Sequence, residues 1–253
     1  MALTGPVRTL TALGYDTVPA LVPLSYPGRP VPVPSLLLGD ELLELAADGP
    51  AGHWLLSGNG ARLDDVLVDR GHAPTTARTP VLAVGSNASP AQVAHKLARL
   101  GLPVAVPMVP LRVRGIGIGC SAHIGRNGYV AAAPYPDPRA AHTLVVSWLD
   151  EAQLTAVDAT ELPNYRRTAL ADPPLPGIQL YVSEHGVLRD PLTGAPRPGG
   201  GDQARLLSAL MAGSPALRSL LGPAPDDWVR RAAASAAVRE EGTRLLGGGL
   251  GPR

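Results

Sequence analysis

The stretch VLAVGSNASPAQ at residues 81–92 decides the fold, because an apolar run passes through a glycine turn into a helix start. Its first residues predict a buried strand. Ser89 fits the N-cap position, Pro90 the first helical position and Gln92 the third, which is the pattern of a capping box. The helix is expected to end at Gly101. A strand that turns directly into a helix is therefore predicted in the middle of the chain.

A second stretch, DATELPNYRR at residues 158–167, ends another helix. Asp150 is the expected N-cap, Gln153 completes a capping box, and Pro163 stops the helix near Glu161. Alternating and β-branched segments around the two helices predict further strands. These strands are expected at residues 111–119, 128–133, 142–149, 165–170 and 178–182. Together they indicate an α+β fold.

The flanks of this centre are rich in loops, since the 28 prolines concentrate at residues 19–50 and 173–200. Residues 1–79 are expected to form an N-terminal extension or small subdomain, with a short helix within 35–47 and a short strand at 62–69. Residues 80–190 are expected to form the central domain. Residues 191–253 are expected to form a helical C-terminal extension, with helices at 202–211, 215–221 and 226–246.

Composition excludes several classes of function. The net charge of +1 is not the excess of positive charge that is typical of a nucleic-acid-binding protein. A single cysteine cannot form an internal disulfide, and the six histidines have no spacing that suits a metal. No apolar run approaches the roughly 20 residues of a membrane span. The first residues lack the pattern of a signal peptide, so a cytoplasmic location is expected.

Glu161 is the strongest candidate for chemistry. Leu154, Val157 and Glu161 share one helix face, which is expected to pack inward. Loss of water and the negative end of the helix dipole both disfavour the charged form of this carboxylate. A general acid/base that works near neutral pH requires this environment. The alternatives are that Glu161 turns to solvent in the last turn of the helix, or that it forms a structural ion pair with Arg166 or Arg167.

The turn at Gly85, Ser86 and Asn87 is the second candidate. A glycine directly after a strand allows the backbone to approach a ligand closely. The amides that follow lie next to a helix N-terminus, where an anion is favoured. The alternative is an ordinary strand–turn–helix connection in which Asn87 tolerates a left-handed conformation.

Two other patterns carry less weight. The glycines at 115, 117 and 119 lack the spacing and the following helix of a dinucleotide loop. Cys120 with His123 could suggest a thiol nucleophile, but a lone cysteine is more often a buried apolar residue. Residues 120–127 could instead form a mobile loop that touches a substrate.

Three of these stretches, in this order, resemble the gamma-glutamylcyclotransferase-like family: GSN at 85–87, GYVAA at 128–132 before VSWL at 146–149, and the DxxE…YRR pattern of 158–167. The resemblance covers roughly residues 80–185. It implies a small mixed β-barrel with flanking helices. The chain departs from the family at Val84, where an aromatic residue, often tyrosine, is usual.

The resemblance also implies a function. Glu161 would be the general acid/base. The substrate would be bound by Val84, Gly85, Ser86 and Asn87. Tyr165 would line the pocket or orient the substrate. The reaction would release an amine from a γ-glutamyl or related acyl amide and form 5-oxoproline, with no metal or organic cofactor. Two alternatives stay open: hydrolysis of the amide at the same site, and a non-catalytic module that binds a small molecule.

Overall fold

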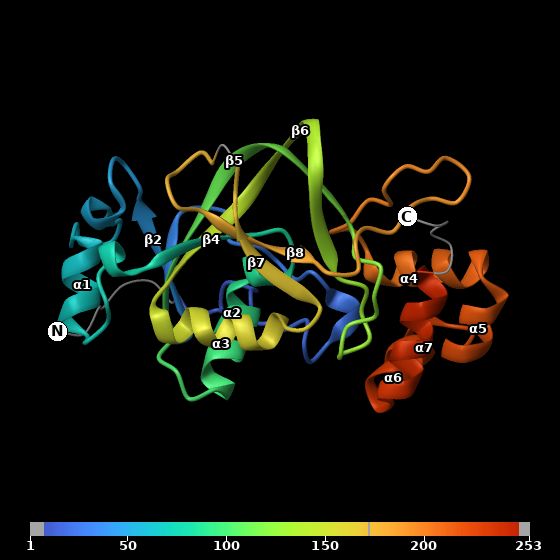
Figure 1. The fold of residues 1–253 in the computed structure, drawn as a ribbon. Coiled ribbons are helices and arrows are strands. Elements are labelled where there is room, and N and C mark those ends of the chain that lie inside the picture. The colour runs from blue at the N-terminus through green and yellow to red at the C-terminus, as the bar shows by residue number, and fades with distance from the viewer. Residues whose placement is uncertain (1–7, 172, 248–253) are drawn as a thin grey trace.

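The computed structural model describes residues 8–171 and 173–247, which form an α+β fold. Eight strands form one mixed sheet in the order β3-β2-β1-β5-β6-β4-β8-β7. The order is linear, with β3 and β7 at its two ends. Figure 1 shows α1 and the group α4–α7 at opposite ends of the molecule, with α2 and α3 between them. No helix among the described residues is long and apolar enough to cross a membrane.

Two long strands, β5 (Ala105–Cys120) and β6 (Ala132–Leu149), form the antiparallel centre of the sheet. Their register shifts between Arg114 and Ile116, at Gly115, whose φ of +81° suits glycine and a bulge. The region of the three glycines is therefore strand. The strand predicted at 128–133 begins only at Ala132. On the other side of β6 lie β4 (Thr79–Ala83), β8 (Gln179–Ser183) and β7 (Tyr165–Ala169).

The two predicted helix starts are confirmed. In α2 (Pro90–Arg99) the Ser89 side chain accepts from the Gln92 amide. The Gln92 side chain does not close a box on Ser89, because its Oε1 accepts from the Ala20 amide at 2.9 Å. In α3 (Glu151–Glu161) Asp150 and Gln153 form the complete capping box. A 3-10 turn, η4 (Ser86–Ala88), joins β4 to α2.

The helix predicted within residues 35–47 is wrong. This segment is a hairpin of β1 (Ser35–Leu38) and β2 (Glu41–Ala46), and β1 also pairs with β5. Leu36 and Leu43 pack in one core cluster, whereas Leu37 and Leu42 pack in the cluster on the other face. A strand buried on both faces is a continuous apolar run, which does not differ in pattern from a buried helix.

The strand predicted at residues 62–69 is also wrong, because α1 (Leu63–Asp69) is helical. Leu63, Val66 and Leu67 are buried, and their spacing of i, i+3 and i+4 is that of a helix face. The short strand β3 (Leu55–Leu56) pairs with β2 beside it. Three further 3-10 turns complete this half of the chain: η1 (Pro23–Ser25), η2 (Ala51–His53) and η3 (Thr75–Ala77).

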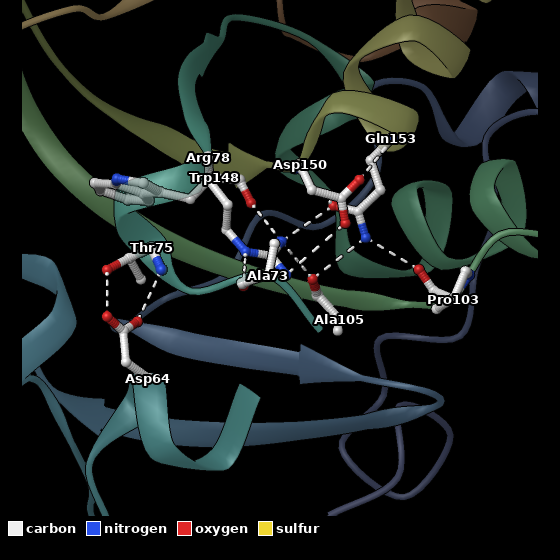
Figure 2. Close-up of polar contacts among 9 residues, drawn as sticks. All are labelled: Asp64, Ala73, Thr75, Arg78, Pro103, Ala105, Trp148, Asp150 and Gln153. Atoms are coloured by element: carbon white, nitrogen blue, oxygen red, sulfur yellow. Dashed lines mark hydrogen bonds and ion pairs between the residues drawn. The ribbon is translucent and has the colours of Figure 1, made fainter. Parts of the chain in front are cut away.

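Arg78 joins the segment before β4 to the centre of the molecule (Figure 2). Its side chain is fully buried. Its Nε donates to the Ala73 carbonyl at 2.8 Å, and its Nη1 donates to the carbonyls of Ala105 and Trp148 at 2.9 and 3.2 Å. The same Nη1 donates to Oε1 of Gln153 in the capping box. One guanidinium thus holds β5, β6 and the start of α3 together.

The C-terminal helices are α4 (Gln203–Gly213), α5 (Pro215–Leu221), α6 (Pro225–Ala234) and α7 (Ala236–Gly247). The single helix predicted at 226–246 is wrong, because Ser235 adopts φ −140° and ψ 122°. Its hydroxyl accepts from the Val238 amide, which caps α7. Trp228 is fully buried and donates from Nε1 to the Gly128 carbonyl at 2.9 Å. This bond ties α6 to the loop between β5 and β6.

Candidate functional site

A cleft of about 930 Å³ lies where the β4–α2 turn, the end of α3 and the β5–β6 loop meet. This volume is in the range of small-molecule sites. One wall comes from α7, through Ala236, Arg239, Glu240 and Thr243. All six residues predicted for the site line the cleft: Val84, Gly85, Ser86, Asn87, Glu161 and Tyr165.

Glu161, the last residue of α3, is held in the cleft by two side chains. Its Oε1 accepts from Lys96 Nζ at 2.9 Å and from Asn87 Nδ2 at 3.0 Å. Lys96 also donates to Asn87 Oδ1 at 2.9 Å, which closes a triangle of contacts. The side chains of Lys96 and Glu161 are only 11% and 18% exposed. No described residue donates a hydrogen bond to Oε2, so this oxygen is free to accept a proton from a ligand.

Neither arginine considered from the sequence pairs with Glu161. Arg166 pairs with Glu184 at 3.0 Å, and Arg167 forms a bidentate pair with Asp158 at 2.8 Å. The hydrogen bonds from Arg167 lower the pKa of the Asp158 carboxyl. The contact between Glu161 and Lys96 was missed from the sequence. No local pattern signals it, because Lys96 and Glu161 are 65 residues apart and meet only through the packing of α2 against α3.

The Gly85 turn differs from the expected open cradle. A Cβ on Gly85 would overlap the Tyr26 hydroxyl, so the glycine makes room for that phenol. Tyr26 accepts from the Ala132 amide at 2.7 Å and stacks on Tyr129 with ring centroids 4.5 Å apart. Burial raises the pKa of Tyr26 well above its ordinary value. A tyrosine from the N-terminal segment therefore stands beside the turn that follows Val84.

The amides of this turn are partly engaged. Those of Ala88 and Ser89 donate to the carbonyls of Gly85 and Ser86 at 3.0 Å. The N–H of Gly85 has no hydrogen-bond partner among the residues that the structure describes, although a backbone donor at such a position normally has one. It can therefore donate to a ligand oxygen in the cleft.

Tyr165 forms part of the wall. It is 8% exposed, and its hydroxyl donates to the Ala132 carbonyl at 3.0 Å. Burial raises its pKa above the ordinary value. The phenol is therefore protonated, and its hydroxyl hydrogen is already used in the bond to Ala132. This arrangement suits packing against a substrate and does not suit proton transfer.

A cluster of histidine and serine side chains lies beside Tyr165. Ser121 Oγ is 2.6 Å from His123 Nδ1 and 2.7 Å from Ser183 Oγ. His185 Nε2 is 2.9 Å from Asn164 Oδ1, and the two imidazole rings stack with centroids 4.7 Å apart. Burial lowers the pKa of His123 to about 3 and also lowers that of His185. Both rings are neutral near pH 7.

Cys120 and His123 do not form a thiol pair, and the interpretation of Cys120 as a buried residue is confirmed. Cys120 Sγ donates to the Pro198 carbonyl at 3.2 Å, and His123 faces Ser121 instead. Burial raises the pKa of the Cys120 thiol to about 11, so it is not a thiolate. Within residues 8–171 and 173–247, no three His, Cys, Asp or Glu side chains are grouped to hold a metal ion.

The charges that line the cleft favour an anionic ligand. Basic side chains outnumber acidic ones in the lining of the cleft. The basic residues are Lys96, Arg99, Arg126 and Arg239, and the acidic residues are Glu161 and Glu240. The cleft thus combines a carboxylate with one free oxygen, an unpaired backbone donor and neutral imidazoles. Comparison of the chain with protein-family models, curated proteins and solved structures gives no match.

Proposed function

We propose that this protein is a cofactor-free cyclotransferase that releases an amine from a γ-glutamyl or related acyl amide and forms 5-oxoproline. The observation that carries the proposal is the Glu161 carboxylate, which lines the cleft. Its Oε1 is fixed by Lys96 and Asn87, while Oε2 accepts no hydrogen bond from the described residues. The proposal includes a barrel of the gamma-glutamylcyclotransferase-like type within the α+β fold, and a cytoplasmic location.

In the proposed reaction Glu161 Oε2 accepts a proton from the α-amine of the substrate. The amine nitrogen attacks the γ-carbonyl carbon, and a five-membered ring closes as the new C–N bond forms. The original amide C–N bond then breaks. Glu161 returns the proton to the departing nitrogen, so the products are 5-oxoproline and a free amine. No water, oxidant or reductant is consumed.

The surroundings of Glu161 support each step. Contacts from Lys96 and Asn87 fix the carboxylate, which removes the orientational freedom that slows a reaction. The N–H of Gly85 can donate to the oxygen that gains charge as the amine attacks. The excess of basic side chains suits the α-carboxylate of a γ-glutamyl substrate.

Mass spectrometry of a panel of γ-glutamyl amides incubated with the protein tests this function. The proposal predicts equal amounts of 5-oxoproline and free amine. Free glutamate in place of 5-oxoproline would change the reaction to hydrolysis at the same carboxylate. Binding of panel members without turnover would favour a non-catalytic module, and it would overturn the proposed reaction.

A further inference from the structure

We propose that His123 is a second substrate-binding residue, which donates a hydrogen bond from Nε2 to a carbonyl or carboxylate oxygen of the substrate. The inference deepens the proposed function and rests on it. It identifies a subsite on the β5–β6 loop, separate from the Gly85–Asn87 turn and from Glu161.

His123 is buried in the wall of the cleft. The residue is 3% exposed, yet it lines the cleft. Its Nε2 has no hydrogen-bond partner among the described residues. This unpartnered nitrogen is not fully buried, since it differs in this respect from the fully buried unpartnered atoms among the described residues. Nε2 is therefore the edge of the ring that reaches the cleft.

The proposed contact requires one tautomer of the ring. Ser121 Oγ lies 2.6 Å from His123 Nδ1, a distance that an O–H donor reaches. In the proposed arrangement the Ser121 hydroxyl donates to Nδ1, and the ring carries its proton on Nε2. Ser183 Oγ can donate to Ser121 Oγ at 2.7 Å, since it accepts from the His185 amide at 3.1 Å.

The chemistry of a neutral donor fits this place. The stacked ring of His185 and the edge of Tyr165 face His123, and neither supplies a negative charge to stabilise an imidazolium. A neutral imidazole can still polarise a carbonyl oxygen. It adds no cation that would compete with Lys96 for Glu161. His123 therefore binds an oxygen atom without taking part in the proton transfer.

Substitution separates a substrate contact from a structural role. We expect His123→Leu to lower kcat/KM for the best γ-glutamyl amide by about 10- to 100-fold, because a polar contact to the substrate is lost. His123→Gln places an amide donor near the Nε2 position and should recover most of that loss. Ser121→Ala should have a smaller effect, since Ser121 acts only through the ring. His142→Leu, a histidine on β6 outside the cleft, is the matched control.

Rescue by glutamine supports the contact. Equal kcat/KM for wild type and His123→Leu, with 5-oxoproline still formed, would overturn this inference and leave the proposed function standing. Equal losses in His123→Leu and His123→Gln, accompanied by equal falls in melting temperature, would also overturn it, because they indicate a purely structural role.

A second readout does not depend on turnover. Nitrogen-15 NMR of the histidine rings should show a proton on His123 Nε2 in the free protein and a shift of that signal on titration with 5-oxoproline or glutarate. If no panel member is turned over, the proposed function fails, but this titration still tests the subsite. A ring protonated on Nδ1, or an Nε2 signal that neither compound shifts, would overturn it.

Discussion

Glu161 is oriented by side chains that stand 65 and 74 residues earlier in the chain. Lys96 comes from the helix after the Gly85 turn, and Asn87 comes from the turn itself. The turn and Glu161 could be predicted, because glycine after a strand and a carboxylate on an apolar helix face are local patterns. Their mutual contact, and the approach of Tyr26 to Gly85, depend on how distant segments pack, which no local pattern encodes.

His123 should make the stability of the protein depend on pH. Burial holds its pKa near 3 in the folded state, against an ordinary value of 6.5. Below pH 6.5 the unfolded chain binds a proton that the folded protein does not. This contribution to stability is therefore complete above pH 6.5 and is lost as the pH falls toward 3, at about 1.4 kcal/mol per pH unit.

Urea unfolding of wild type and His123→Gln from pH 7 to pH 4 measures this effect. The variant should lose stability less steeply than wild type on acidification. The other histidines are present in both proteins, so the difference between the two slopes reports His123. Parallel curves would show that this ring is protonated in the folded protein.

At the scale of elements, α3 positions the site because both of its ends are fixed. The capping box at its start contacts the buried Arg78, and Glu161 at its end contacts α2. In its last turns Asp158 accepts from Arg167 and from Tyr181. The carboxylate therefore lies on a rigid helix that is joined to strands on two sides.

Replacement of Arg78 by methionine should loosen this arrangement. The Trp148 carbonyl would lose the hydrogen bond from Arg78, and the Ala105 carbonyl would keep only the longer one from Gln153 Nε2 at 3.3 Å. Unsatisfied buried groups cost about 1–3 kcal/mol each. We expect the free energy of unfolding to fall by about 3 kcal/mol in a urea titration. Arg62→Met, an exposed arginine in the same region, should change it by less than about 0.5 kcal/mol. A loss below 1 kcal/mol in Arg78→Met would contradict the structural role of this residue.

Elements with explicit end signals could be predicted, whereas the apolar hairpin β1–β2 could not. Helices α2 and α3 carry their own caps, so Ser89 and Asp150 locate them. The β1–β2 hairpin is apolar on both faces, and its leucines match a buried helix equally well. The break at Ser235 has no glycine or proline to mark it. Its local signal is a single serine that caps α7 within an otherwise continuous helical pattern.

At the scale of the whole molecule, the flanks complete the cleft. Tyr26 from the N-terminal segment fills the space at Gly85, and α7 forms a wall. Thr243 of α7 accepts from the Ile124 amide at 3.0 Å, which ties the β5–β6 loop to the C-terminal helices. The resemblance covers roughly residues 80–185, so it implied no role in the site for α7.

Trp228 should couple the C-terminal helices to the cleft. Its truncation in Trp228→Ala removes a fully buried ring and the bond to Gly128, so we expect a loss of roughly 3–5 kcal/mol in stability. KM should rise as well, because the loop that it holds lines the cleft. Trp228→Phe keeps most of the packing and should cost less. Unchanged KM in a destabilised Trp228→Ala protein would show that the loop keeps its position without α6.

The central claim is that Glu161 transfers the proton during formation of 5-oxoproline. The most direct measurement is the initial rate of 5-oxoproline release from the best γ-glutamyl amide by wild type, Glu161→Gln and Glu151→Gln. Glu151 is exposed at the other end of α3, so its variant controls for the loss of a carboxylate. We predict a fall of roughly 10²–10⁴-fold in Glu161→Gln with folding retained, and wild-type rates in Glu151→Gln. A wild-type rate in Glu161→Gln would contradict the account.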